Sequence, residues 1–202
     1  AGPEISVATT KAYSAQLIAA YTLALQFAKE RNEIEMPEYE KLIKELDTLP
    51  DKIQEVIDNQ EEIQKFAAKQ AAAKDVFFIG RGIDYAVSLE GSLKLKEISY
   101  IHSEAYAAGE LKHGTISLIE DGTLVIGVLT QDELYEKTIS NMVECKSRGA
   151  YLMGLTTYGN YTVEDTAEFT VYVPKTDAHF MASLAVVPLQ MLGYYVSVAK
   201  GL

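Results

Sequence analysis

The sequence has little cysteine, little positive charge and no long apolar run. Cys145 is the only cysteine among 202 residues, which excludes an intramolecular disulfide and favours a reducing compartment. Residues 1–11 do not join a basic segment to an apolar one, so we expect no signal peptide. The longest apolar stretch, residues 12–28, is too short and too polar to cross a membrane. We therefore expect a cytoplasmic protein that makes no contact with a membrane.

The scarcity of basic residues also limits the ligands that the protein can bind. Lysine and arginine number 18 against 29 acidic residues, and the net charge is −11. Such a charge argues against a nucleic-acid partner, because phosphate backbones require a basic surface. A sugar phosphate remains possible, since a few backbone amides can hold an anion within an acidic protein. The few histidines and the one cysteine show no ligand spacing, so we expect no metal and no cofactor.

The first 74 residues contain no strand pattern. Residues 10–32 predict a helix that is apolar nearly all round, which indicates burial against a missing part of the protein or a second copy. Pro37 and Pro50 bracket a second predicted helix, and a third is expected from Asp51 to about Lys74. We interpret residues 1–74 as an interdomain segment with a helical arm.

Strands and helices alternate after residue 75. Apolar runs at 76–79, 124–129, 151–155 and 169–173 predict buried strands, and helices are expected over 84–102, around 134–143 and over 182–200. Continuous apolar runs are typical of a parallel sheet covered on both faces. We predict an α/β fold for residues 75–202, a three-layer αβα sandwich with a parallel, flavodoxin-like sheet. Ligands of such sheets bind beyond the carboxyl ends of the strands, here at 80–82 and after Leu129.

Three charged residues share one face of the helix expected over 84–102. Glu90, Lys94 and Glu97 are four and three positions apart, which places them within about 60° of one another on a helix. This pattern is also typical of an exposed row of ion pairs. Because the helix follows a strand and a glycine turn at the expected ligand edge, a catalytic role is an equal alternative.

Two further residues are candidates for the site. His113 precedes a glycine in a loop of small residues, where it could exchange protons near neutral pH or be an ordinary surface histidine. Arg81 lies between two glycines and could hold a sugar or phosphate, or pair with a neighbouring carboxylate.

The run LEGSLKLKEISYIHSEAYAAGELKHG, residues 89–114, closely resembles the second sugar-isomerase (SIS) domain of the glucosamine-6-phosphate synthase family. The opening AGPEISVATTKAY, the segment FFIGRG and the final VPLQMLGYYVSVAKG resemble further parts of the same isomerase module. The resemblance implies a glutamine–fructose-6-phosphate transaminase (isomerizing). Such an enzyme converts fructose 6-phosphate and glutamine to glucosamine 6-phosphate and glutamate, by a ketose–aldose isomerisation.

The resemblance also implies a role for each candidate residue. Glu97 matches the glutamate that moves a proton between C1 and C2 of the sugar, and Lys94 and Glu90 match neighbours that hydrogen-bond the open-chain sugar. His113 matches a histidine of sugar ring opening that reaches into the partner subunit.

The opening segment is expected to line the sugar pocket. There Val7 and Thr9 match a motif that the family usually spells VASTKA, and this chain reads VATTKA. Arg81 is expected to shape the pocket near the substrate.

Several parts of the family enzyme are expected to lie outside this sequence. These are a glutaminase domain, a first SIS domain with a Ser/Thr-rich phosphate loop, and a carboxyl-terminal tail that carries a lysine. We therefore expect the isolated chain to bind fructose 6-phosphate weakly, to turn nothing over, and to derive from a homodimer.

Two alternative functions remain open. One is another SIS-type enzyme, such as a phosphosugar isomerase, deglycase or deaminase. The other is a regulatory module that binds a sugar phosphate without catalysis, which could dispense with Glu97, Lys94 and His113. Replacing Glu97 by glutamine in the full-length protein would separate a catalyst from a sensor.

Overall fold

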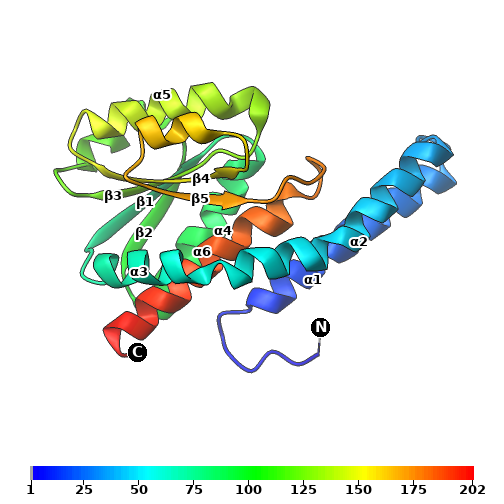
Figure 1. The fold of residues 1–202 in the computed structure, drawn as a ribbon, viewed down its shortest axis with the longest axis horizontal. Helices are drawn as coiled ribbons and strands as arrows, with labels where there is room; N and C mark the ends of the chain where they lie inside the picture. Colours follow the sequence, from blue (N-terminus) through cyan, green and yellow to red (C-terminus); the bar gives the residue numbers. More distant parts are fainter. Residues whose placement is uncertain (1) are drawn as a thin grey trace.

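A computed structural model describes residues 2–202 (Figure 1). Its α-helices are α1 (Thr10–Glu30), α2 (Met36–Asp58), α3 (Gln60–Gln70), α4 (Ile83–Ser99), α5 (Tyr135–Lys146) and α6 (Met181–Lys200). Its strands are β1 (Asp75–Gly80), β2 (His102–Ala107), β3 (Leu124–Val128), β4 (Tyr151–Thr157) and β5 (Phe169–Val173). Short 3-10 turns are η1 (Leu111–His113), η2 (Thr115–Leu118), η3 (Asp132–Leu134) and η4 (Tyr161–Asp165).

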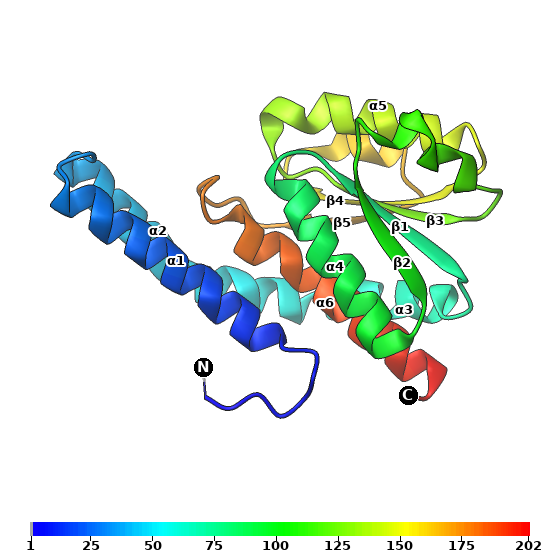
Figure 2. The ribbon, with the colours of Figure 1, turned by 180° about the vertical axis from the view of Figure 1, so that it is seen from behind.

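The five strands form one parallel sheet in the order β2-β1-β3-β4-β5. Alternate residues of β1 point to opposite faces of the sheet, as the pleat of a strand requires. Val76 and Phe78 enter the core shared with α3, α4 and α6, whereas Phe77 and Ile79 enter the core shared with α5. Figures 1 and 2 show these helices covering the two faces, which confirms the predicted three-layer α/β sandwich.

Helix α6 is the central helix of the larger core. It is long and apolar enough to cross a membrane by length and composition, but most of it is buried within this fold. It packs against α2, α3, α4 and β5. Gly91 of α4 allows α6 to approach closely, because a Cβ there would lie 2.6 Å from Cδ1 of Leu189.

Helices α1 and α2 extend away from the sheet as a pair, and the chain returns to the sheet along α2 (Figures 1 and 2). The predicted boundary at Pro50 is wrong, because α2 runs through this proline to Asp58. Proline lacks the amide that a helix interior uses. The buried residues Leu42, Leu49 and Val56 join the core that includes α6, and this packing holds the helix together on both sides of the proline.

Helix α1 remains partly uncovered in this chain. Its apolar residues Leu23 and Phe27 are 55% and 62% exposed. Near the middle of the helix, the ring of Tyr21 meets Phe180 edge-on at 5.0 Å. Cover of α1 by a missing part of the protein or a second copy stays a prediction.

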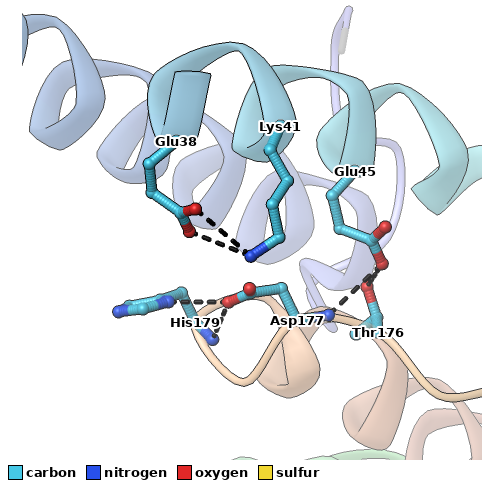
Figure 3. Close-up of polar contacts among 6 residues, drawn as sticks. All are labelled: Glu38, Lys41, Glu45, Thr176, Asp177 and His179. Carbon is cyan, nitrogen blue, oxygen red and sulfur yellow. Dashed lines mark hydrogen bonds and ion pairs between the residues drawn. The ribbon is translucent and has the colours of Figure 1, made fainter. Parts of the chain in front are cut away.

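A polar contact joins the arm to the loop that precedes α6 (Figure 3). The carboxylate of Glu45 accepts hydrogen bonds from the Thr176 hydroxyl at 2.6 Å and the Asp177 amide at 3.2 Å. Lys52 pairs with the same carboxylate at 2.5 Å. Hydrogen bonds from Lys52 and Thr176 lower the pKa of Glu45 despite its partial burial.

The predicted extent of the helix over 84–102 is also wrong at its carboxyl end. Helix α4 stops at Ser99, because Tyr100 adopts a left-handed conformation with φ 59°. His102 then begins strand β2, which continues through residues expected to form a loop. The strand lies at the edge of the sheet, paired with β1.

Candidate functional site

The ammonium of Lys94 is the centre of the candidate site. The residue is 3% exposed, although it carries a charge. Its Nζ donates to Glu97 Oε2 at 2.7 Å and lies 3.6 Å from Glu90 Oε1. A third contact runs to the carbonyl oxygen of Ala8 at 2.6 Å. A buried charge requires such pairing, because an unpaired one would be strongly destabilising.

The two glutamates beside Lys94 differ in their access to solvent. The Glu90 side chain is 12% exposed, and within residues 2–202 its Oε1 atom has no hydrogen-bond partner. Burial raises the pKa of Glu90, the Lys94 charge opposes this shift, and the Glu97 carboxylate adds to it. The Glu97 side chain is 31% exposed. Glu97 can therefore meet a ligand, whereas Glu90 is placed to hold Lys94.

Helix α4 positions all three charges in the way that their spacing predicts. The other faces of α4 are buried in the fold through residues such as Leu95 and Gly91. The location of the cluster differs from the prediction. Strand β2 begins beside Asp75, the first residue of β1, so α4 ends near the amino-terminal ends of the strands. Glu97 therefore lies away from the carboxyl edge of the sheet. The prediction that it lies at this edge is wrong.

Residues 3–9, which precede α1 and are called the strap below, reach the charged cluster. Thr9 adopts a left-handed conformation, and its hydroxyl donates to the Val7 carbonyl at 2.7 Å. The Val7 side chain is 91% exposed. The atom of the strap that meets Lys94 is the Ala8 carbonyl, which the sequence analysis did not identify, since no side-chain pattern marks a backbone acceptor.

A groove of about 590 Å³ opens beside the strap. Ser6, Ala8 and Thr10 form one wall, and Ile98, the neighbour of Glu97, contributes to it as well. Residues of α6, among them Gln190, form the other side. The groove has room for a small molecule. Glu90, Lys94 and Glu97 do not line it, and its link to them is Ala8, whose carbonyl accepts a hydrogen bond from Lys94.

Arg81 lies elsewhere, at the carboxyl edge of the sheet. Its guanidinium donates to the Asn141 side-chain oxygen at 2.9 Å and packs against Gly109. Its backbone carbonyl accepts a hydrogen bond from Gln131 at 2.6 Å. The structure does not bring Arg81 to Glu97, and its contacts are those of a residue that ties β1 to α5.

The same edge of the sheet holds a buried carboxylate, Asp84. Burial raises its pKa, while hydrogen bonds from Thr130 and Gln131 act in the opposite direction.

A cavity of about 470 Å³ lies farther along the edge, between the loops after β3, β4 and β5. Asp132 and Glu133 line it beside a single lysine, Lys175. This balance of charge disfavours a phosphate at the edge of the sheet where the fold class predicts a ligand.

His113 is exposed at the end of η1, beyond β2. It makes no contact with Lys94 or Glu97 in this chain, so its expected role from a second subunit stays a prediction. Among residues 2–202, no group of histidine, cysteine and carboxylate side chains is placed to hold a metal. Within the cluster of Glu90, Lys94 and Glu97, the partly exposed Glu97 carboxylate is the group that can meet a ligand.

Comparisons with known proteins agree with this fold. The family model of the SIS domain matches residues 71–200. A glutamine–fructose-6-phosphate aminotransferase [isomerizing] from Caldanaerobacter subterraneus is 55% identical over 201 residues, which cover all of this chain and 33% of that protein. The chain thus spans about a third of the length of this curated relative.

Two solved structures extend the likeness. The C-terminal domain of glucosamine-fructose-6-phosphate aminotransferase from Francisella tularensis has a TM-score of 0.91 and 34% identity, over 99% of this chain and 57% of that one. A glucosamine-6-phosphate deaminase from Thermotoga maritima has a TM-score of 0.73 and 25% identity, over 100% of this chain and 55% of that one. On the match to residues 71–200, the chain belongs to the SIS domain family.

Proposed function

We propose that this chain is the second SIS domain of a glutamine–fructose-6-phosphate aminotransferase, and that Glu97 is its acid/base residue. The observation that carries the proposal is the contact between Lys94, which is buried, and Glu97, which is partly exposed, at 2.7 Å. The relative that bears this enzyme name and is 55% identical supports the same conclusion.

The arrangement suits a ketose–aldose isomerisation. Such a reaction needs one base that takes a proton from C1 of the open-chain sugar and returns it to C2. Glu97 is accessible enough for this transfer, and the Lys94 ammonium can stabilise the negative charge that develops on the sugar oxygens. Glu90 holds the ammonium in place from the other side at 3.6 Å.

The remaining parts of the site come from outside this chain in our proposal. A first SIS domain supplies the phosphate-binding loop, a glutaminase domain supplies ammonia, and His113 of a second subunit assists ring opening. The exposed apolar residues of α1, Leu23 and Phe27, are consistent with cover by such a partner. We place the enzyme in the cytoplasm, as a homodimer that acts on fructose 6-phosphate and forms glucosamine 6-phosphate.

The decisive experiment replaces Glu97 by glutamine in the full-length parent protein. Loss of the proton acceptor should lower glucosamine 6-phosphate formation by roughly 10²- to 10⁴-fold while fructose 6-phosphate still binds. Glu62→Gln, which removes a carboxylate from an exposed ion pair on α3, is the matched control and should change nothing. Full product formation by Glu97→Gln would refute the proposal.

A non-catalytic sugar-phosphate sensor is the second candidate, and an SIS-type deaminase is a third. The likeness to a deaminase of Thermotoga maritima keeps the third candidate open. A sensor carrying Glu97→Gln would keep its ligand response, and its wild type would form no product. A deaminase would release ammonia from glucosamine 6-phosphate without glutamine.

A further inference from the structure

Three side chains donate hydrogen bonds to the backbone of the strap. Its residues form neither helix nor strand. Lys11 Nζ donates to the Pro3 carbonyl at 2.6 Å, and the Thr9 hydroxyl donates to the Val7 carbonyl at 2.7 Å. The Ala8 carbonyl receives Lys94. Three carbonyls of one short segment are thus fixed by hydroxyl and ammonium groups.

The Thr9 hydroxyl bonds the Val7 carbonyl instead of capping helix α1. Threonine at the position before a helix usually caps it by accepting a hydrogen bond from a backbone amide. Here Thr9 makes no such bond to α1. It also adopts φ 51° and ψ 38°, a left-handed conformation that a β-branched residue rarely takes. The hydroxyl therefore stabilises the strap, and α1 begins without a side-chain cap.

Lys11 lies in a position that is equally unfavourable for helix α1. A positive charge in the first turn opposes the helix dipole, and this turn contains no acidic residue that would compensate. Its ammonium instead reaches back eight residues to Pro3. Two neighbouring residues therefore break local rules for helix starts, and both direct their polar groups to strap carbonyls. Such conflicts concentrate where function requires a fixed backbone.

We infer that Lys11 and Thr9 are positioning residues that hold the strap against the ligand side of the Lys94–Glu97 pair. Lys11 fixes the amino-terminal half, Thr9 fixes the bend at Val7, and Lys94 fixes Ala8. The inference rests on the proposed function, in which the Lys94–Glu97 pair acts on the sugar. Release of the strap would weaken substrate binding, whereas the proton transfer at Glu97 would continue once the sugar is bound.

The test uses the full-length enzyme with fructose 6-phosphate and glutamine as substrates. Lys11→Ala should raise the KM for fructose 6-phosphate roughly 3- to 10-fold and change kcat less than about twofold, as expected for the loss of one hydrogen bond. Lys11→Arg, which can still donate to the Pro3 carbonyl, should restore the KM. Lys65→Ala, which breaks an exposed pair with Glu62, is the control and should leave both constants unchanged.

A second pair of variants separates positioning from stability. Thr9→Val keeps the shape of the side chain but removes the hydroxyl, and it should raise the same KM, whereas Thr9→Ser should not. Limited proteolysis within residues 4–8 should accelerate in Lys11→Ala and in Thr9→Val, because a released segment is more accessible to a protease.

The outcomes distinguish this inference from the proposed function. An unchanged KM in both Lys11→Ala and Thr9→Val would overturn the positioning role if Glu97→Gln is inactive in the same enzyme. A fall in kcat that Lys11→Arg does not rescue would also overturn it. If Glu97→Gln retains activity, the proposed function itself is wrong.

Discussion

The carboxylate of Asp84 accepts hydrogen bonds from both the backbone amide and the hydroxyl of Thr130, at 2.8 and 2.5 Å. These donors lie just beyond β3, where ligands of parallel sheets commonly bind. In this domain a side chain of the protein occupies the donors instead. These two donors of Thr130 are therefore already paired and not free for a ligand at the carboxyl edge of the sheet.

Replacing Asp84 by asparagine should destabilise the fold. An amide has one acceptor oxygen where the carboxylate has two, and its NH₂ group would face buried donors, at a cost of about 1–3 kcal/mol. Urea unfolding of the wild type, Asp84→Asn, Thr130→Val and the double variant would measure the coupling between the two residues. Strictly additive effects would show that the contact contributes nothing.

The close approach of α4 and α6 makes Gly91 sensitive to substitution. In Gly91→Ala, the new Cβ would lie 2.6 Å from Cδ1 of Leu189 and 3.1 Å from the Phe78 ring, so the Leu189 side chain or one of the two helices must shift. We expect a loss of about 1–3 kcal/mol from overpacking, against a gain of about 1 kcal/mol in helix propensity. Thermal unfolding would show a net decrease in stability. Ala86→Gly on the exposed side of α4 is the comparison, and there only propensity should act.

Glu45 should give the stability of the arm a dependence on pH. Its pKa is lower in the folded protein than in the unfolded chain, so the carboxylate stabilises the fold above about pH 4. This contribution is lost as the pH falls through the lower, folded-state pKa. Thermal unfolding of wild type and Glu45→Gln should therefore differ most at pH 7, and the difference should shrink as the pH falls below the ordinary pKa of a glutamate.

The outer pair of Figure 3 provides the control for this experiment. Glu38→Gln breaks an exposed contact with Lys41 at 3.0 Å and should change stability by less than about 1 kcal/mol at any pH. A constant difference between wild type and Glu45→Gln from pH 3 to pH 7 would contradict the expected linkage.

Spacing along the sequence was sufficient to place Glu90, Lys94 and Glu97 together, because a helix fixes the angle between residues three and four apart. The apolar runs likewise predicted four of the five strands. Strand β2 was missed because its sequence, HSEAYA, is polar and lies at the edge of the sheet, where only part of the strand is buried.

Other features depend on contacts that sequence patterns do not record. The continuation of α2 through Pro50 depends on packing that α6 provides from more than 100 residues away. Lys94 is buried because the strap covers it. Its partner in the strap is the backbone carbonyl of Ala8, and any residue type at that position would supply such a carbonyl. The direction of α4 places Glu97 near the amino-terminal ends of the strands, because the helix leads into the parallel strand β2, which was not predicted.

The bond from Lys94 to Ala8 joins residues 86 positions apart. During synthesis the strap therefore leaves the ribosome long before Lys94, the residue whose ammonium anchors it. Helix α6, against which α4 packs, is not synthesised until about a hundred residues after Lys94. An incomplete chain can contain every member of the charged cluster and still lack the scaffold that assembles it. Formation of this contact is thus coupled to completion of the domain.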